Sequence, residues 1–195
     1  MKVVIFDFDG VIVDSFSASY RSWVLSFKGL SEEDFKARLL GNIYENKFEK
    51  KLKEESREGL FGEYKKRLLF IPPNEDVSET LQKLKKKYLL FINSSAPEEA
   101  LNEYIKKYKL NGLFEEVLGY NFSKSKVIKF KYLFEKYDLK REDCIFVTDT
   151  LGDIREANEV GLKTIAVDFG FHDREVLEKG KPLKIISEFK DLLEM

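Results

Sequence analysis

Two acidic residues stand close together near the start of the chain. Asp7 and Asp9 occupy alternate positions at the end of an apolar run that begins at Val3, and Gly10 follows them. Because side chains two positions apart on a strand point to the same side, we expect both carboxylates to face the same space. Two carboxylates at that range repel each other, so a cation is required to keep both ionised. Taken alone, the pair fits either a cation site or an acidic turn closed by Gly10.

Further polar side chains follow the later strand patterns. They comprise two hydroxyls, two lysines and two more acids: Ser94, Ser95, Lys124, Lys126, Asp149 and Asp153. Ligands of open α/β sheets bind at the carboxyl ends of the strands, which is where this order places these residues. Ser94 and Ser95 also precede a helix that starts after Pro97, and a helix N-terminus suits an anion. The combined set offers ligands for a cation and for an anion, and a phosphate ester with Mg²⁺ satisfies both.

The elements that must carry these residues alternate along the chain. Short apolar runs predict strands at Val3–Phe8, Tyr88–Ile92, Glu116–Leu118, Cys144–Thr148, Thr164–Val167 and Lys184–Ile186. Helical patterns lie between them at Ser78–Lys87, Glu98–Lys107, Val127–Tyr137 and Asp153–Val160. Because the strand patterns are apolar without alternation, both faces of the sheet should be covered. We predict an α/β fold, a Rossmann-like parallel sheet with helices on both faces and right-handed crossovers.

The segment 15–74 breaks this alternation, because no run within it predicts a strand. Its patterns indicate helices at Phe16–Phe27 and Ser31–Leu40, then a charged helical stretch through Leu69. Ser31 is a favourable N-cap for the second of these helices. The segment is long enough for a small helical domain inserted after the first strand. We therefore predict a catalytic core formed by residues 1–14 and 75–195, with an α-helical cap over 15–74.

Taken together, these motifs resemble those of the haloacid dehalogenase superfamily, and the resemblance covers the whole chain. The matching motifs are, in order, Asp7-Phe8-Asp9-Gly10-Val11, then Ser94, a lysine, and Asp149 with Asp153. The helical insert is similar to the α-helical cap of that superfamily. Asp14-Ser15, together with the spacing of Asp153, Ala157 and Gly161, most resembles the phosphoglycolate phosphatase and beta-phosphoglucomutase branch.

The resemblance implies a role for each matched residue. Asp7 would be the nucleophile that forms an aspartyl-phosphate, and Asp9 would act as general acid and then as general base. Ser94, with Ser95 beside it, would bind the transferring phosphoryl group, and the lysine would neutralise its charge. The implied cofactor is Mg²⁺, held by Asp7, the backbone carbonyl of Asp9, Asp149 and Asp153, the last either directly or through a bound water.

The lysine of the third motif has two candidates. Lys124 lies 25 residues before Asp149 and Lys126 lies 23 before it, and both spacings occur in the family. Lys126 enters the following helix directly, which favours it, and both lysines remain candidates for binding the phosphate. Thr148 is a second departure, because the family often has glycine before the fourth-motif aspartate; we expect the threonine to be tolerated.

The implied function is a Mg²⁺-dependent phosphatase acting on a small phosphorylated metabolite such as phosphoglycolate, with pyrophosphate and sugar phosphates also open. Asp9 argues against dehalogenation, because a halide leaving group needs no proton. A phosphomutase acting on a sugar phosphate would use the same core residues. The non-enzymatic alternative is a phospho-acceptor signalling module. In that module the first strand supplies only metal ligands, and the phosphorylated aspartate comes from a later strand, so the order of acids here disfavours it.

Composition bears on the partners, the kinds of site and the location that the protein can have. The 195 residues contain 34 Lys and Arg against 35 Asp and Glu, so net charge gives no argument for nucleic acid or an anionic membrane as partner. One cysteine and one histidine exclude an internal disulfide and a zinc site built from several Cys and His. No apolar run is long enough for a signal peptide or a membrane span, so we expect a cytoplasmic protein. The expected oligomeric state is a monomer or a homodimer. His172 is expected to be a surface or loop residue.

Overall fold

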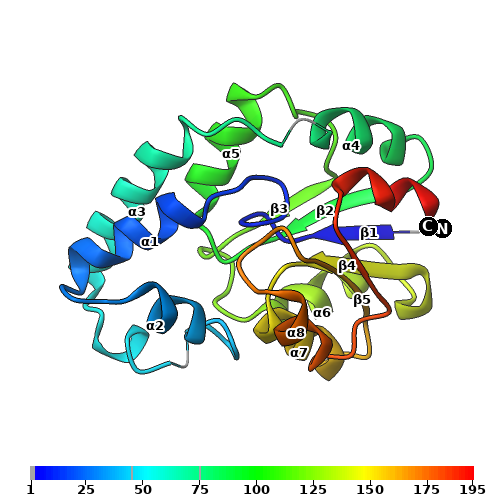
Figure 1. Ribbon diagram of the computed structural model, residues 1–195. Coiled ribbons are helices and arrows are strands. Elements are labelled where there is room, and N and C mark those ends of the chain that lie inside the picture. The colour runs from blue at the N-terminus through cyan, green and yellow to red at the C-terminus, as the bar shows by residue number, and fades with distance from the viewer. Residues whose placement is uncertain (1–2, 45, 75) are drawn as a thin grey trace.

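A parallel sheet forms the centre of the protein. The computed structural model describes residues 3–44, 46–74 and 76–195. Within these ranges, six strands form one sheet in the order β3-β2-β1-β4-β5-β6, and every pairing is parallel. Their bounds are β1 Val3–Phe6, β2 Leu89–Asn93, β3 Glu116–Leu118, β4 Cys144–Thr148, β5 Lys163–Val167 and β6 Lys184–Ile186. The order reverses at β1, so β1 lies between β2 and β4 (Figure 1).

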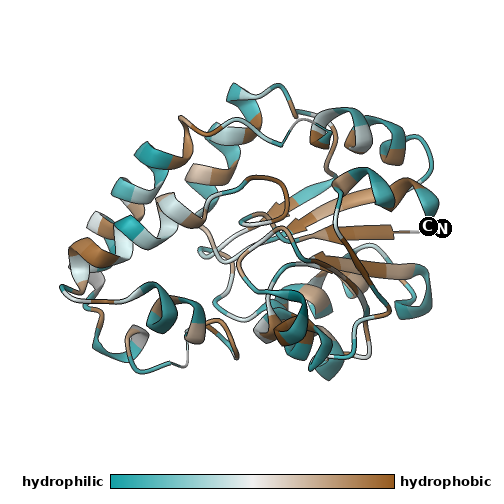
Figure 2. Ribbon diagram, viewed as in Figure 1, coloured by the Kyte–Doolittle hydropathy of each residue, from teal (hydrophilic) through white to brown (hydrophobic). Residues whose placement is uncertain are grey.

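Helices cover both faces of this sheet (Figure 1). α4 (Val77–Lys85) and α5 (Glu98–Lys107) lie on one face, and α6 (Lys126–Lys136) and α7 (Leu151–Glu159) lie on the other. Val4 and Phe6 of β1 pack into the cluster under α4 and α5, whereas Val3 and Ile5 pack into the cluster under α6. Both side-chain sets of β1 are therefore buried, which explains its unbroken apolar sequence, brown in Figure 2. The predicted fold class is confirmed.

Element boundaries differ from the predicted ones by a few residues. β1 ends at Phe6 rather than Phe8, because the chain turns at once into a loop in which Asp9 bridges to Val13. α7 begins at Leu151, two residues before the predicted start, because the Thr150 side chain caps it by accepting a hydrogen bond from the Asp153 N–H at 3.3 Å. The short helix α8 (Arg174–Glu178) was not predicted, since five residues give too little periodicity to detect.

In the residues that the structure describes, the regular elements between β1 and α4 are helical. They are α1 (Phe16–Ser26), α2 (Glu32–Ala37), the 3₁₀ turn η1 (Glu49–Lys51) and α3 (Glu54–Leu68). Ser31 caps α2 as predicted, accepting a hydrogen bond from the Asp34 N–H at 3.0 Å. α1 and α3 lie side by side beyond the carboxyl ends of the strands (Figure 1). Residue 75, the predicted start of the second core segment, lies outside the described residues, as do residues 1, 2 and 45.

Helices α1, α2 and α3 form a helical layer that has an apolar cluster of its own. Trp23, Phe35 and Leu60 pack there, and Phe171 joins them from the loop after β5. None of the helices in the described ranges is long and apolar enough to cross a membrane.

Candidate active site

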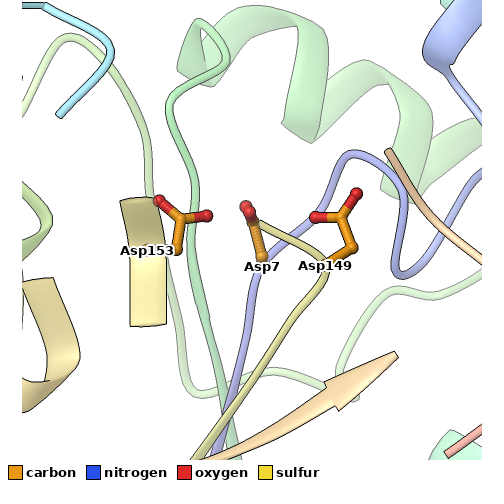
Figure 3. Close-up of side chains that lie close together, drawn as sticks. All are labelled: Asp7, Asp149 and Asp153. Carbon is orange, nitrogen blue, oxygen red and sulfur yellow. The ribbon is translucent and has the colours of Figure 1, made fainter. Parts of the chain in front are cut away.

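Three aspartates meet at the carboxyl edge of the central strands. Asp7 follows β1, Asp149 follows β4, and Asp153 lies in the first turn of α7. The pairing of Phe6 with Val147 sets β1 beside β4, and the Asp7 N–H donates to the Val147 carbonyl at 2.8 Å. One carboxylate oxygen from each aspartate lies within 4.8 Å of the other two, and all three side chains are buried (Figure 3). The structure therefore brings these predicted residues together.

Lys126 lies against this cluster. Its Nζ is 2.8 Å from Asp7 Oδ1 and 3.2 Å from Asp153 Oδ2, and it donates to the Asn93 carbonyl at 2.9 Å. Burial alone would lower the pKa of the Lys126 ammonium, but the charges of Asp153 and Asp7 outweigh burial and raise it. Lys124 is exposed, and its Nζ lies over the ring of Tyr120 instead. The geometry thus sets Lys126, and not Lys124, beside the aspartates.

The electrostatics of the acids fit a divalent cation. Burial raises the pKa of Asp149 to about 8, and burial with the charges of Asp153 and Asp149 raises the pKa of Asp7 well above its usual range, although Lys126 opposes it. For Asp153 burial also opposes ionisation, but the Lys126 charge prevails and lowers the pKa. Asp149 Oδ1 is buried without a hydrogen-bond partner among the described residues. An acceptor-only oxygen buried in this way is costly unless a cation satisfies it.

Asp153 is also held by the threonine that departs from the family pattern. The Thr148 hydroxyl donates to Asp153 Oδ2 at 3.0 Å, and Thr148 is buried. The side chain is therefore accommodated at this turn, and its hydroxyl orients one of the clustered acids.

Gly10 allows the first loop to approach Asp149. Its φ is +73°, in the left-handed region, and a Cβ placed there would lie 1.9 Å from Asp149 Oδ2 and 3.0 Å from Phe171 Cδ1. The same oxygen, Asp149 Oδ2, accepts a hydrogen bond from the Phe171 N–H at 2.7 Å. The position of this carboxylate therefore depends on a residue without a side chain at position 10.

We expect Gly10→Ala to lower phosphate-ester turnover by about 100-fold, because the added methyl must displace Asp149 and a misplacement of about 1 Å has that effect. The left-handed φ should also cost about 1–2 kcal/mol of unfolding free energy. Gly29→Ala is the matched control, since Gly29 has φ +81° with nothing within 4 Å of its Cβ position. Denaturant unfolding and steady-state kinetics would measure both effects. Equal turnover in the two variants would show that the contact with Asp149 is unimportant.

Asp9 is bound by two hydroxyl groups and stands apart from the three clustered carboxylates. Its Oδ1 accepts hydrogen bonds from the Ser15 hydroxyl and, at 2.5 Å, from the Tyr64 hydroxyl of α3. Burial raises the pKa of Asp9, although the hydrogen bonds from Ser15 and Tyr64 oppose that rise. A carboxyl that keeps its proton more readily than usual is suited to general acid catalysis.

The two predicted hydroxyl residues differ in position. Ser94 is fully buried, and its Oγ accepts a hydrogen bond from the Ala96 N–H at 3.0 Å. Ser95 lines a cavity that Asp7 and Asp9 also line, and its carbonyl accepts from the Tyr44 hydroxyl at 2.7 Å. The structure thus brings Ser95 to the cavity surface and sets Ser94 beneath it. A phosphate-binding role for either residue stays a prediction.

The cavity lies between the strand ends and the helical layer. Besides the aspartates and Ser95, it is lined mainly by apolar and aromatic side chains of that layer, which include Trp23, Phe35, Leu39, Leu60 and Phe61. A mostly apolar pocket with a few converging polar groups is typical of small-molecule sites.

Two residues in contact with this site were not predicted. Lys129 is fully buried on α6, and its Nζ donates to the Ser94 carbonyl; burial and the Lys126 charge lower its pKa to about 7. Its place three residues after Lys126, on the same helix face, was the available signal. Tyr64 belongs to a charged helix whose sequence gives no sign of its contact with Asp9.

His172 lies in a loop, one of the two positions expected for it, but it is buried rather than at the surface. The residue is only 3% exposed, and burial lowers its pKa. Its Nδ1 accepts a hydrogen bond from the Leu151 N–H at 3.0 Å, and its Nε2 lies 3.1 Å from the Lys36 carbonyl. The imidazole therefore links the N-terminus of α7 to α2, which a sequence pattern around one histidine does not reveal.

Comparison with known proteins identifies the family. A family model described as haloacid dehalogenase-like hydrolase matches residues 4–167. The chain belongs to this family. The predicted family and the predicted enzyme class, a hydrolase, are therefore confirmed. The match spans the first strand, the helical insert and the sheet as far as β5, so it includes every aspartate of the site.

The individual relatives include proteins named phosphoglycolate phosphatase and pyrophosphatase. A phosphoglycolate phosphatase from Aliivibrio fischeri is 30% identical over 122 residues, which cover 60% of this chain and 54% of that protein. A pyrophosphatase PpaX from Bacillus mycoides is 26% identical over 215 residues, which cover 99% of this chain and 95% of that protein. Among solved structures, a haloacid dehalogenase-like hydrolase from Streptococcus pneumoniae has a TM-score of 0.81 at 20% identity, covering 100% of this chain and 97% of that one. The structural likeness concerns the fold.

Proposed function

We propose that the chain is a Mg²⁺-dependent phosphatase that hydrolyses a small phosphorylated metabolite through an aspartyl-phosphate on Asp7. The observation that carries the proposal is the buried arrangement of Asp7 with Lys126, Asp149 and Asp153 beside a cavity that Asp9 lines. The phosphatase names of the relatives support the same reaction.

The proposed reaction has two steps. A carboxylate oxygen of Asp7 attacks the phosphorus, the bond to the ester oxygen breaks, and the leaving oxygen takes the electron pair and a proton from Asp9. Asp9 then removes a proton from water, whose oxygen attacks the phosphorus, and the electron pair of the broken bond returns to Asp7. The ammonium of Lys126 lies where it stabilises negative charge on the phosphoryl group.

The proposed metal ligands are the clustered acids Asp7, Asp149 and Asp153, with the backbone carbonyl of Asp9. When bound, Mg²⁺ would supply positive charge to the phosphoryl oxygens. The residues fit such an ion because they are hard oxygen ligands, and Asp149 has a buried oxygen that no group in the described part of the chain hydrogen-bonds.

Residues 15–74 are proposed to act as a cap that excludes water from the cavity and selects the alcohol part of the substrate. The position of the cavity, between the strand ends and the helices of this segment, favours a small partner, and phosphoglycolate is the proposed substrate. The cytoplasm and a monomeric or homodimeric state are proposed on sequence grounds alone.

Phosphate release from a panel of small phosphate compounds tests the proposal. With Mg²⁺, we expect turnover of at least one of phosphoglycolate, pyrophosphate and sugar phosphates. Absence of release from every compound, with Mg²⁺ binding intact, would contradict hydrolysis. A sugar phosphate that is isomerised without phosphate release would instead identify a phosphomutase.

Removal of the metal should abolish phosphate release, because no bound cation would then offset the charge of the phosphoryl group or keep the buried carboxyls ionised. We expect a chelator to stop turnover and added Mg²⁺ to restore it. Mg²⁺ alone should stabilise the folded protein by about 2.7 kcal/mol at 100 times its dissociation constant, measured by thermal unfolding. Turnover that persists in the chelator would argue against a metal site.

A further inference from the structure

We propose that Tyr64 is a positioning residue for the general acid, fixing which oxygen of Asp9 faces the leaving group. The inference rests on the proposed function and extends it to a residue of the helical insert. Tyr64 lies on α3, 55 positions from Asp9 in the sequence, and its hydroxyl reaches Asp9 Oδ1 at 2.5 Å.

The tyrosine is firmly held. Its side chain is 5% exposed and packs into the apolar cluster that contains Phe8 and Leu68, so the ring has little freedom to turn away. Tyr64 also lines the cavity together with Asp9 and Asp7. The hydrogen bond therefore joins the helical insert to the loop that follows β1.

The two oxygens of Asp9 are in different environments. Oδ1 accepts hydrogen bonds from both Ser15 and Tyr64. Within the part of the chain that the structure describes, Oδ2 accepts none, and the residue is only partly buried at the cavity wall. When Asp9 is protonated, the two hydrogen bonds that Oδ1 accepts favour placing the acidic proton on Oδ2. A proton on Oδ1 would point at the hydrogens of the two hydroxyl donors. Tyr64 thus directs the acidic proton to the oxygen that these donors leave free and holds the carboxyl in one rotamer.

This role predicts a dependence on the leaving group. An alkyl alkoxide needs a proton from Asp9 as its bond to phosphorus breaks, whereas p-nitrophenolate leaves without one. The ratio kcat/KM reports the steps up to formation of the aspartyl-phosphate, so it isolates this proton transfer from the later attack of water. A general disruption of the folded structure would instead lower kcat/KM for both esters.

The experiment compares Tyr64→Phe with the wild type on phosphoglycolate and on p-nitrophenyl phosphate, both with Mg²⁺. We expect kcat/KM for phosphoglycolate to fall by about 10- to 100-fold, part of the 10²–10⁴-fold that general acid catalysis provides. For p-nitrophenyl phosphate the fall should be less than about threefold. If phosphoglycolate is not turned over by the wild type, the alkyl ester from the panel with the highest kcat/KM takes its place.

Tyr20→Phe is the matched control. Tyr20 lies on α1 in the same helical layer, and its hydroxyl donates to the Leu30 carbonyl at 2.8 Å, away from Asp9. We expect this variant to keep the wild-type ratio between the two esters. Equal losses on both esters in Tyr64→Phe, or no loss on either, would overturn the positioning role. Failure of the wild type to turn over any ester would instead overturn the proposed phosphatase function.

Discussion

Asp7→Asn should lower phosphate release by about 10⁴-fold or more, because an amide cannot form the acyl-phosphate on which the proposed mechanism depends. The change is nearly isosteric, and the amide oxygen can still accept from the Phe8 N–H, which donates to Asp7 Oδ1 at 2.7 Å. The fold should therefore survive. Phosphate release under saturating Mg²⁺ would measure the loss, and trapping of a labelled phosphoenzyme would show whether the covalent intermediate disappears with it.

Asp168→Asn provides the matched control for this change. Asp168 also follows a strand of the sheet, β5, but it binds Arg174, with Oδ2 2.6 Å from Nη2, and it does not line the cavity. We expect turnover within about twofold of the wild type, since surface changes away from the chemistry have small effects. Turnover by Asp7→Asn at more than about one hundredth of the wild-type rate would contradict the assignment of the nucleophile.

The positions of the aspartates could be predicted because buried parallel strands leave a strong pattern. β1 must bury Val3 and Ile5 on one face and Val4 and Phe6 on the other, so its sequence is apolar until the sheet ends. The next polar residue then falls at the carboxyl edge, where ligands bind. The same reasoning places Asp149 after β4, so local burial is enough to locate both acids.

The contacts that cross between distant segments could not be predicted. Spacing left Lys124 and Lys126 as alternatives, because the choice depends on which residue starts α6 and turns inward toward Asp7. Tyr64 reaches Asp9 only through the packing of α3, a helix with a weak apolar pattern. His172 is buried, and its ring nitrogens contact backbone groups of Leu151 in α7 and Lys36 in α2. Each of these positions follows from tertiary packing, which periodicity does not encode.

Lys126→Ala should affect both stability and catalysis, since it leaves Asp7 and Asp153 without their buried counter-charge. Removing one partner of a buried ion pair costs about 3–5 kcal/mol of unfolding free energy. Turnover should fall by about 10²–10³-fold, the usual effect of losing one group that stabilises charge in the transition state. Lys124→Ala is the control, because this side chain is exposed over Tyr120; we expect changes within about 0.5 kcal/mol and threefold in rate.

The pH dependence of stability makes the prediction for Lys126 more specific. Without the lysine, the pKa of Asp7 in the folded state rises further above its value in the unfolded chain, and Asp153 loses the charge that lowers its pKa against the effect of burial. The folded state of the variant therefore holds protons more tightly than the unfolded state does. The stability deficit of Lys126→Ala should therefore be larger at pH 8 than at pH 5, where the folded carboxyls can take up protons. Mg²⁺ should reduce the deficit at pH 8 by replacing the lost positive charge. Denaturant unfolding at both pH values, with and without Mg²⁺, would measure these deficits. Equal mild losses of turnover in the Lys124 and Lys126 variants would contradict the placement of Lys126 at the reacting phosphate.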